Sequence, residues 1–109
     1  MREIKFRAWD IDGKIMCFGQ VALDAIPLAE INPEVKIMQY TGLLDRTGKE
    51  IYEGDIVKFG NWKPKEIVYY YKNFAGFSLK DTDCWLLDYD TKEMEVIGNI
   101  YENPELIKA

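Results

Sequence analysis

The chain has 109 residues, which is enough for one compact core and too few for two ordinary domains. Its 48% hydrophobic and 30% charged residues exclude a disordered chain, and no uninterrupted apolar run predicts a secretory signal or a membrane-spanning helix. The net charge of −5 disfavours general nucleic-acid binding, and the absence of histidine excludes Ser-His and Cys-His catalysis. We therefore expect one globular domain located in the cytoplasm.

The first forty residues predict a β-hairpin followed by an irregular connection. Residues 4–9 alternate with the period of a half-buried strand, and residues 14–18 form the returning strand after an Asp12-Gly13 turn that tolerates positive φ. Between residues 19 and 36, Pro27 and Pro33 each lack a backbone donor, and the residue before a proline favours extended backbone. We expect no more than one short helical turn there, and little helix in the whole chain.

The stretch from residue 40 to residue 59 carries the clearest turn signals. Three glycines recur every six residues, where we expect backbone that turns or closely approaches another segment: Gly42, Gly48 and Gly54. The sequence from Asp45 to Gly48 has the residue preferences of a type I turn. At the next corner we expect Gly54 to take a conformation closed to other residues, and Asp55 to accept backbone hydrogen bonds.

Short strands with even spacing predict an SH3-like barrel after this corner. The expected strands are residues 37–40 before the turn, then 55–59, 66–71, 77–80, 84–87 and 95–101. Strands 55–59 and 66–71 should pair. The alternation predicts that Val57, Phe59, Ile67, Tyr69 and Tyr71 point inward, and that Ile56, Val68 and Tyr70 point outward. The outward apolar positions need a cover, so we expect residues 1–44 to pack on a barrel built from residues 45–109.

The C-terminal segment combines a strand and a short helical turn. Gly98, inside the last strand, indicates a bend or a close backbone contact. Asn103 followed by Pro104 and Glu105 is favourable chemistry for a helix start. The predicted fold is therefore mainly β: an SH3-like β-barrel with an N-terminal β-hairpin packed on it and a short C-terminal helical turn.

Three ordered blocks of this sequence resemble the YopX family of small phage and prophage proteins. They read IKFRAWD at 4–10, MQYTGL at 38–43 continued by IYEGDIV at 51–57, and IGNIYENP at 97–104. The resemblance covers nearly the whole chain. It implies a β-rich fold with an SH3-like barrel and a phage or prophage origin, and it brings no catalytic residues. From this resemblance we also expect Gly98 and Asn99 to have structural roles.

One surface cluster has the composition of a binding site. Four lysines surround two aromatic residues in the predicted barrel, and the set is Lys58, Trp62, Lys63, Lys65, Tyr70 and Lys72. Lysines and stacking aromatics on strands suit single-stranded nucleic acid, but lysines also protect edge strands from aggregation without any ligand. We favour a non-enzymatic protein-binding or adaptor module. A nucleic-acid-binding module is the alternative, and a small enzyme of unknown chemistry is the third hypothesis.

Metal, redox and acid-base chemistry find little support in the sequence. Cys17 and Cys84 are the only cysteines, and in a reducing compartment both should be free thiols. The acidic residues Asp81, Asp83, Asp88 and Asp90 lack the convergent spacing of a metal site. We predict no cofactor, no metal, no catalytic residues and no membrane partner. The expected partner is a protein from host, phage or a second copy of the chain, and self-association is left open.

Overall fold

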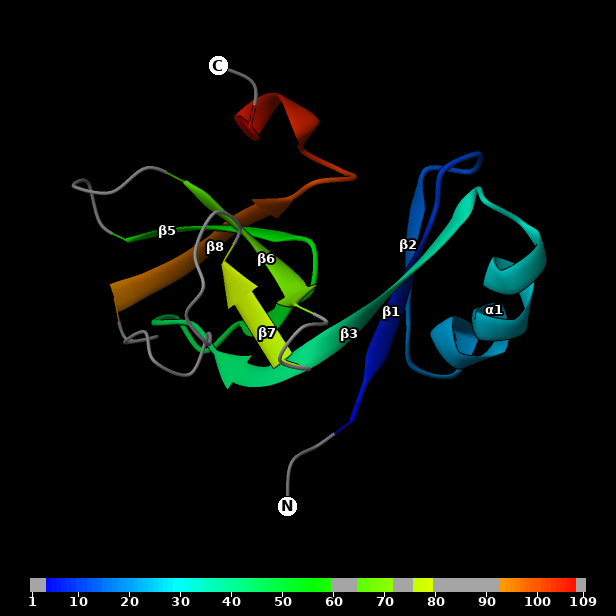
Figure 1. The fold of residues 1–109 in the computed structure, drawn as a ribbon, viewed down its shortest axis with the longest axis horizontal. Helices are drawn as coiled ribbons and strands as arrows, with labels where there is room; N and C mark the ends of the chain where they lie inside the picture. Colours follow the sequence, from blue (N-terminus) through cyan, green and yellow to red (C-terminus); the bar gives the residue numbers. More distant parts are fainter. Residues whose placement is uncertain (1–3, 60–64, 72–75, 80–92, 108–109) are drawn as a thin grey trace. The chain divides into compact units, whose positions relative to one another are not determined.

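The computed structural model describes residues 4–59, 65–71, 76–79 and 93–107, and it divides the chain into two compact units, Met1–Tyr40 and Thr41–Ala109. The elements, in order, are β1 (Phe6–Asp10), β2 (Ile15–Phe18), α1 (Gly19–Ile31), β3 (Val35–Leu44), β4 (Glu50–Tyr52), β5 (Asp55–Phe59), β6 (Glu66–Tyr71), β7 (Gly76–Leu79), β8 (Met94–Asn99) and the 3-10 helix η3 (Pro104–Ile107) (Figure 1). The strands form two antiparallel sheets, ordered β2-β1-β3-β4 and β7-β6-β5-β8. The predicted mainly β fold is confirmed.

The N-terminal hairpin forms where it was predicted, but its turn differs in one detail. Asp10 pairs with Ile15 across the hairpin, so four residues make the loop. The Asp10 Oδ1 atom accepts hydrogen bonds from the amides of Asp12 and Gly13, at 3.1 and 3.2 Å. Lys14 is the residue with positive φ, at 57°. Because the Asp10 carboxylate folds the start of the loop, the left-handed residue falls at its end instead of at Asp12-Gly13.

The helix α1 corrects the expectation of an irregular connection, which was wrong. It spans 13 residues and contains Pro27 in its interior. A proline inside a helix costs about 3 kcal/mol, because the carbonyl four residues earlier, here that of Leu23, loses its donor. The flanking sequence is rich in strong helix formers, which favour a helix despite Pro27: Ala22, Leu23, Ala25, Leu28 and Ala29.

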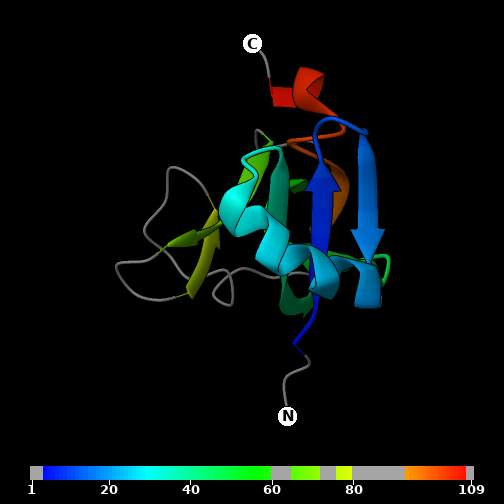
Figure 2. The ribbon, with the colours of Figure 1, turned by 90° about the vertical axis from the view of Figure 1, so that its right-hand side faces the viewer.

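The ends of α1 are poorly capped, so its stability depends on packing within the first unit. No side chain caps its N-terminus, and no acidic residue in its first turn or basic residue in its last turn complements the helix dipole. Pro33 lies beyond its end, where Asn32 donates its amide to the carbonyl of Leu28 at 2.8 Å. The helix packs against β1 and β2 and lies across β1 in Figure 2, with Ala22 fully buried. Helices of this length depend on such packing more than on propensity.

The second unit has a continuous apolar core on one face of its sheet. The core residues are Ile51, Val57, Val68, Phe77, Leu79, Met94 and Val96. In the register of β5 and β6, Val57 pairs with Glu66, and Val68 two residues further on therefore shares the face of Val57. The predicted inward set was wrong for β6: Val68 is buried, whereas Ile67 and Tyr69 on the other face are half-buried.

That error has a physical cause in the period of a strand. A shift of one residue in register exchanges the two faces, and the sequence of the connecting loop did not fix the register. Ile56, predicted to point outward, is also fully buried, while Tyr70 is exposed. The side chains of Phe59 and Tyr71 lie outside the description. Val68 therefore does not belong to an outward patch, and the packing of residues 1–44 on the barrel stays a prediction.

Most other elements of the second unit were predicted within a few residues. The expected strands 55–59, 66–71, 77–80 and 95–101 correspond to β5, β6, β7 and β8. The expected pairing of the first two is present. The sheet that they form curls into half a barrel. The predicted strand at 84–87 falls outside the described residues. The C-terminal helical turn is confirmed as η3, with the Leu106 amide bonded to the carbonyl of Asn103 at 3.1 Å.

Within the described ranges, no helix has both the length and the apolar character needed to cross a bilayer.

Candidate functional site

The structure describes half of the predicted lysine-aromatic cluster. Trp62, Lys63 and Lys72 lie outside the described residues. Lys58 is half-buried on β5, directly opposite Glu95 on β8, so its cross-strand neighbour carries the opposite charge. Lys65 is exposed, and its Nζ atom donates a hydrogen bond to the carbonyl of Leu106 at 3.1 Å. Both described lysines therefore have structural neighbours inside the second unit.

Tyr70 is the remaining described member of that cluster. It is 43% exposed on β6, and its ring makes an edge-on contact with Phe77, with centroids 5.6 Å apart. Phe77 belongs to the core of the second unit. Tyr70 thus lies at the margin of this core, where one side of its ring is packed and the other is accessible.

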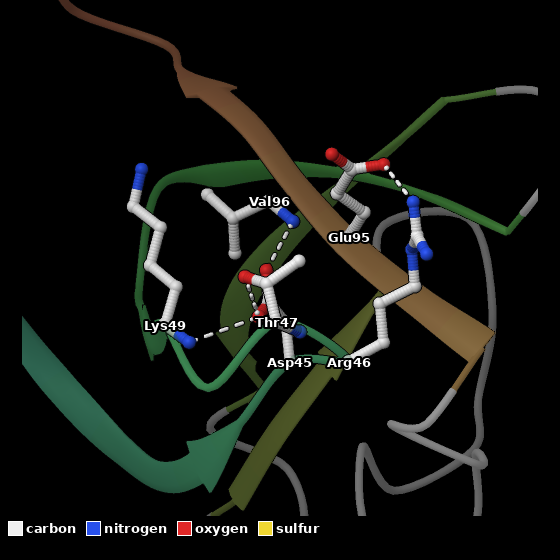
Figure 3. A network of polar contacts seen from close by, with 6 residues as sticks. All are labelled: Asp45, Arg46, Thr47, Lys49, Glu95 and Val96. Carbon is white, nitrogen blue, oxygen red and sulfur yellow. Dashed lines mark hydrogen bonds and ion pairs between the residues drawn. The ribbon is translucent and has the colours of Figure 1, made fainter.

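The turn at Asp45–Gly48 contains a dense polar network, shown in Figure 3. The Oδ1 atom of Asp45 accepts three hydrogen bonds: from the Thr47 amide at 2.8 Å, the Thr47 hydroxyl at 2.7 Å and the Lys49 amide at 3.0 Å. Its Oδ2 atom accepts one from the Val96 amide at 2.9 Å. The Gly48 amide donates to the carbonyl of Asp45 at 3.0 Å, which is the bond of the predicted type I turn.

These contacts change the acidity of the buried Asp45 carboxyl. Burial alone would raise its pKa, but the hydrogen bonds from Val96, Thr47 and Lys49 outweigh it and hold the pKa of Asp45 below its ordinary value. An ionised carboxylate whose two oxygens both accept protein donors is poorly placed to take a proton from a substrate. Asp45 therefore joins its turn to β8, and an exposed ion pair between Arg46 and Glu95 at 3.0 Å lies beside it.

The positions assigned to structure on sequence grounds lie at turns and close contacts. Gly42, Gly48 and Gly54 have φ angles of 91°, 88° and 88°, in the left-handed region that favours glycine. Asp55 is buried, and its Oδ2 atom accepts the Tyr52 amide at 2.7 Å. The corner is also tied to β6, because the Gly54 amide donates to the carbonyl of Val68 at 2.8 Å.

A second buried polar corner follows β8. A Cβ atom added at Gly98 would lie 2.6 Å from Oδ1 of Asn103, so a side chain there forces Asn103 to move. The Oδ1 atom of Asn99 accepts the amides of Tyr101 and Glu102, at 3.1 and 2.8 Å. The Oδ1 atom of Asn103 accepts the Asn99 amide at 3.2 Å, and the Asn103 carbonyl accepts the first bond of η3. These contacts fix the end of the strand.

Groups that could hold a metal or carry redox chemistry are sparse in the described part. Its cysteine and acidic residues form no group of three suited to a metal ion. Cys17 is a half-buried free thiol on β2. Cys84 and the acidic residues Asp81, Asp83, Asp88 and Asp90 fall outside the described ranges.

An exposed apolar surface in the first unit was missed by sequence reasoning. Of eleven large hydrophobic residues exposed in the described part, eight lie before Tyr40: Ile4, Ile11, Ile15, Phe18, Val21, Leu23, Leu28 and Ile31. Four of these are on α1. The signal was present in residues 21–31, which are apolar on nearly every side of a helix, but it has meaning only once a helix is assigned there.

Two comparisons with known proteins bear on the chain as a whole. A family model described as YopX protein matches residues 22–108. The fold is similar to the crystal structure of protein EF1440 from Enterococcus faecalis, with 26% sequence identity and a TM-score of 0.69 over 99% of this chain and 100% of that one. No curated protein matches the chain.

Proposed function

Because the chain belongs to the YopX protein family, and because so much apolar side-chain surface is exposed in its first unit, we propose that it is a non-enzymatic module that binds a protein partner. Large exposed apolar patches on soluble proteins mark sites where another surface docks. The observation that supports the proposal is the concentration of exposed Ile, Leu, Val and Phe side chains between residues 4 and 31.

The contrast with the second unit supports the same proposal. There, among the residues described, the exposed large apolar side chains are Leu44, Tyr70 and Ile107. A binding role for the first unit explains why eight of its large apolar side chains are exposed. No described observation favours nucleic acid: Lys58 faces Glu95 and Lys65 binds the Leu106 carbonyl. The nucleic-acid and enzyme hypotheses therefore remain as alternatives, which the experiment below distinguishes from protein binding.

The setting of this function follows from the family resemblance. We propose an origin in a phage or prophage and a role in the cytoplasm, where the thiol of Cys17 stays reduced. A protein partner would then come from the host, from the phage or from a second copy. The first two are separated by capture from uninfected and infected cells.

The proposal is tested by capture of partners with paired variants of the full chain. Leu28→Ser with Ile31→Ser removes two exposed apolar side chains from α1, and Leu44→Ser is the matched control on the second unit. We expect the α1 variant to lose a protein that the wild type and the Leu44→Ser control both retain. Circular dichroism checks that each variant folds.

Retention of every partner by the α1 variant would contradict the proposal. Binding of labelled single-stranded nucleic acid that weakens steeply with salt, and that Lys58→Glu with Lys65→Glu abolishes, would favour the nucleic-acid alternative instead. Turnover of any captured small molecule would favour an enzyme.

A further inference from the structure

The helix α1 has two apolar sides, and its own sheet uses one of them. Ala22, Ala25 and Ala29, spaced by three and four residues, are buried or half-buried, and α1 packs on β1 and β2. Val21, Leu28 and Ile31 are 61, 53 and 81% exposed. Spacings of seven and three residues place these three within about 80° of each other around the helix axis. We name this set, Val21, Leu28 and Ile31, the α1 stripe.

The charged residues between residues 19 and 34 all have one sign: they are Asp24, Glu30 and Glu34, all acidic and all exposed. Glu30 comes nine residues after Val21, which places it on the opposite side of the helix from the stripe. Asp24 lies three residues after Val21, on the side of the stripe, and its Oδ1 atom accepts a hydrogen bond from the Gln20 amide group at 2.8 Å. The surface beside the stripe is therefore negative.

The helix dipole adds to this negative field at the end where the stripe is most exposed. The C-terminal end of a helix carries a partial negative charge, and the last turn of α1 has no basic residue to offset it. Ile31 is the last residue of α1, between Glu30 and Glu34 in the sequence. An apolar stripe with the Asp24 carboxylate beside it and a helix C-terminus at its end attracts a partner that presents both apolar and cationic groups.

We propose that the α1 stripe is the docking site for a basic amphipathic helix of a partner protein, an inference that rests on the function proposed above. Apolar side chains of that helix pack against Val21, Leu28 and Ile31, and its lysines or arginines lie beside Asp24 and near the C-terminal end of α1. Helix-on-helix docking suits the stripe because the spacing of its residues forms a ridge along the helix, which fits the groove between side-chain rows of a second helix.

The same charges disfavour other occupants of the stripe. In a second copy docked stripe to stripe, α1 offers no basic residue to pair with Asp24 of the other copy. Anionic lipid surfaces and nucleic acids are repelled for the same reason. An acidic amphipathic helix offers the apolar anchors but not the charge complement.

Two designed peptides of about five helical turns test the chemistry directly. Both carry leucines at the spacing of the stripe, one with lysines and the other with glutamates at the remaining positions, and a third peptide has the Leu/Lys composition in scrambled order. Fluorescence anisotropy with the full chain is expected to show binding of the Leu/Lys helix at least tenfold tighter than of the Leu/Glu and scrambled peptides. Equal affinity for the Leu/Lys and scrambled peptides would overturn the proposal, because it shows attraction by charge alone.

A pair of charge variants separates the local field from the net charge. Asp24→Lys with Glu34→Lys reverses one charge beside the stripe and one just beyond the end of α1, and Glu93→Lys with Glu105→Lys makes the same change at exposed positions of the second unit. We expect the first variant to lose binding of the Leu/Lys helix and the second to retain it within about threefold. Equal losses in both variants would overturn the docking site.

Substitution of the stripe itself distinguishes this inference from the proposed function. Leu28→Ser with Ile31→Ser should weaken binding of the Leu/Lys helix at least tenfold, while Leu44→Ser should not. If that variant loses its captured protein partner but the Leu/Lys helix never binds the wild type, the basic-helix inference fails and the proposed function stands. Dimerisation of the wild type in sedimentation equilibrium, abolished by the same variant, would assign the stripe to a second copy and overturn the inference.

Discussion

Residues 41–109 and residues 4–40 differ in where their large apolar side chains lie. In the second unit, Ile51, Ile56, Val57, Val68 and Met94 are fully buried. In the first unit, the most buried apolar positions include the small residues Ala8 and Ala22, whereas isoleucines and leucines are exposed. Burial of a large aliphatic side chain contributes about 1.5–3 kcal/mol, so this difference places the main folding energy in the second unit. The first unit retains apolar surface that a partner can cover.

The two units also differ in how their turns are fixed. Turns of the second unit contain buried polar side chains that accept hydrogen bonds from backbone amides, at Asp45, Asp55 and Asn99. The helix of the first unit begins without a side-chain cap and contains a proline. The second unit therefore has the features of a rigid unit. The first unit has a poorly capped helix, and it leaves apolar side chains exposed instead of using them for its own stability.

The largest effect is expected from Asp45→Ala in the second unit. This change removes an ionised acceptor and leaves the amides of Thr47, Lys49 and Val96 without it. The free energy of unfolding should fall by about 2–4 kcal/mol, because hydrogen bonds to a charged group are stronger than neutral ones. Arg46→Ala is the matched control, which breaks an exposed ion pair and should cost less than about 1 kcal/mol. Equal shifts of the urea midpoint in the two variants would show that the network is no stronger than the surface pair.

A somewhat smaller loss is expected from Gly54→Val. Gly54 has a φ of 88°, and its amide and carbonyl both bond across the unit, to Val68 and Ile100. A β-branched residue held in that conformation costs about 1–3 kcal/mol. Chemical denaturation measures the loss, and an unchanged midpoint would show that the corner relaxes to ordinary backbone.

Pro27→Ala in the first unit is expected to raise the free energy of unfolding instead of lowering it. Alanine restores the amide that can bond the carbonyl of Leu23, and it removes a cost of about 3 kcal/mol for proline inside a helix. Part of that gain is offset because proline also restricts the unfolded chain, so we expect a net gain of about 1–2 kcal/mol. Amide hydrogen exchange should slow in α1 and stay unchanged in β5. Faster exchange in α1 would mean that the proline shapes a bend that the unit requires.

Stability should also depend on pH in acid, through Asp45 in the second unit. Since the pKa of Asp45 is below its ordinary value of 3.8 in the folded state, its contribution to stability is complete above that value. It is lost as the pH falls through the lower folded pKa, when the carboxylate is protonated. We therefore expect the unfolding free energy of the wild type to fall below pH 4, and that of Asp45→Asn to fall less steeply. Parallel pH profiles would exclude Asp45 as the source.

Local signals in the sequence predicted the turns and strands of the second unit well. The type I turn at Asp45–Gly48 and the Gly54-Asp55 corner depend on residues next to each other in the chain, so their chemistry is readable without the fold. The faces of β6 were not readable, because they depend on the pairing of Val57 with Glu66 across a loop.

The helix and the surface that it carries were missed together. Pro27 received more weight than the alanines and leucines around it, although packing of the helix on β1 and β2 offsets one unfavourable residue. Without a helix, Val21, Leu28 and Ile31 have no common side, so the α1 stripe had no visible pattern. The predicted lysine-aromatic cluster was assembled from residues that are close together in the sequence. Half of it lies outside the described part of the chain.

Amide hydrogen exchange of the full chain, with and without the Leu/Lys helical peptide, tests most directly whether the peptide binds the first unit and not the second. We expect slower exchange in α1 when the peptide is bound, with β5, β6 and β8 unchanged. Slower exchange in β5 and β6 with α1 unchanged would contradict it, and would place the working surface near Lys58 and Tyr70 on the second unit.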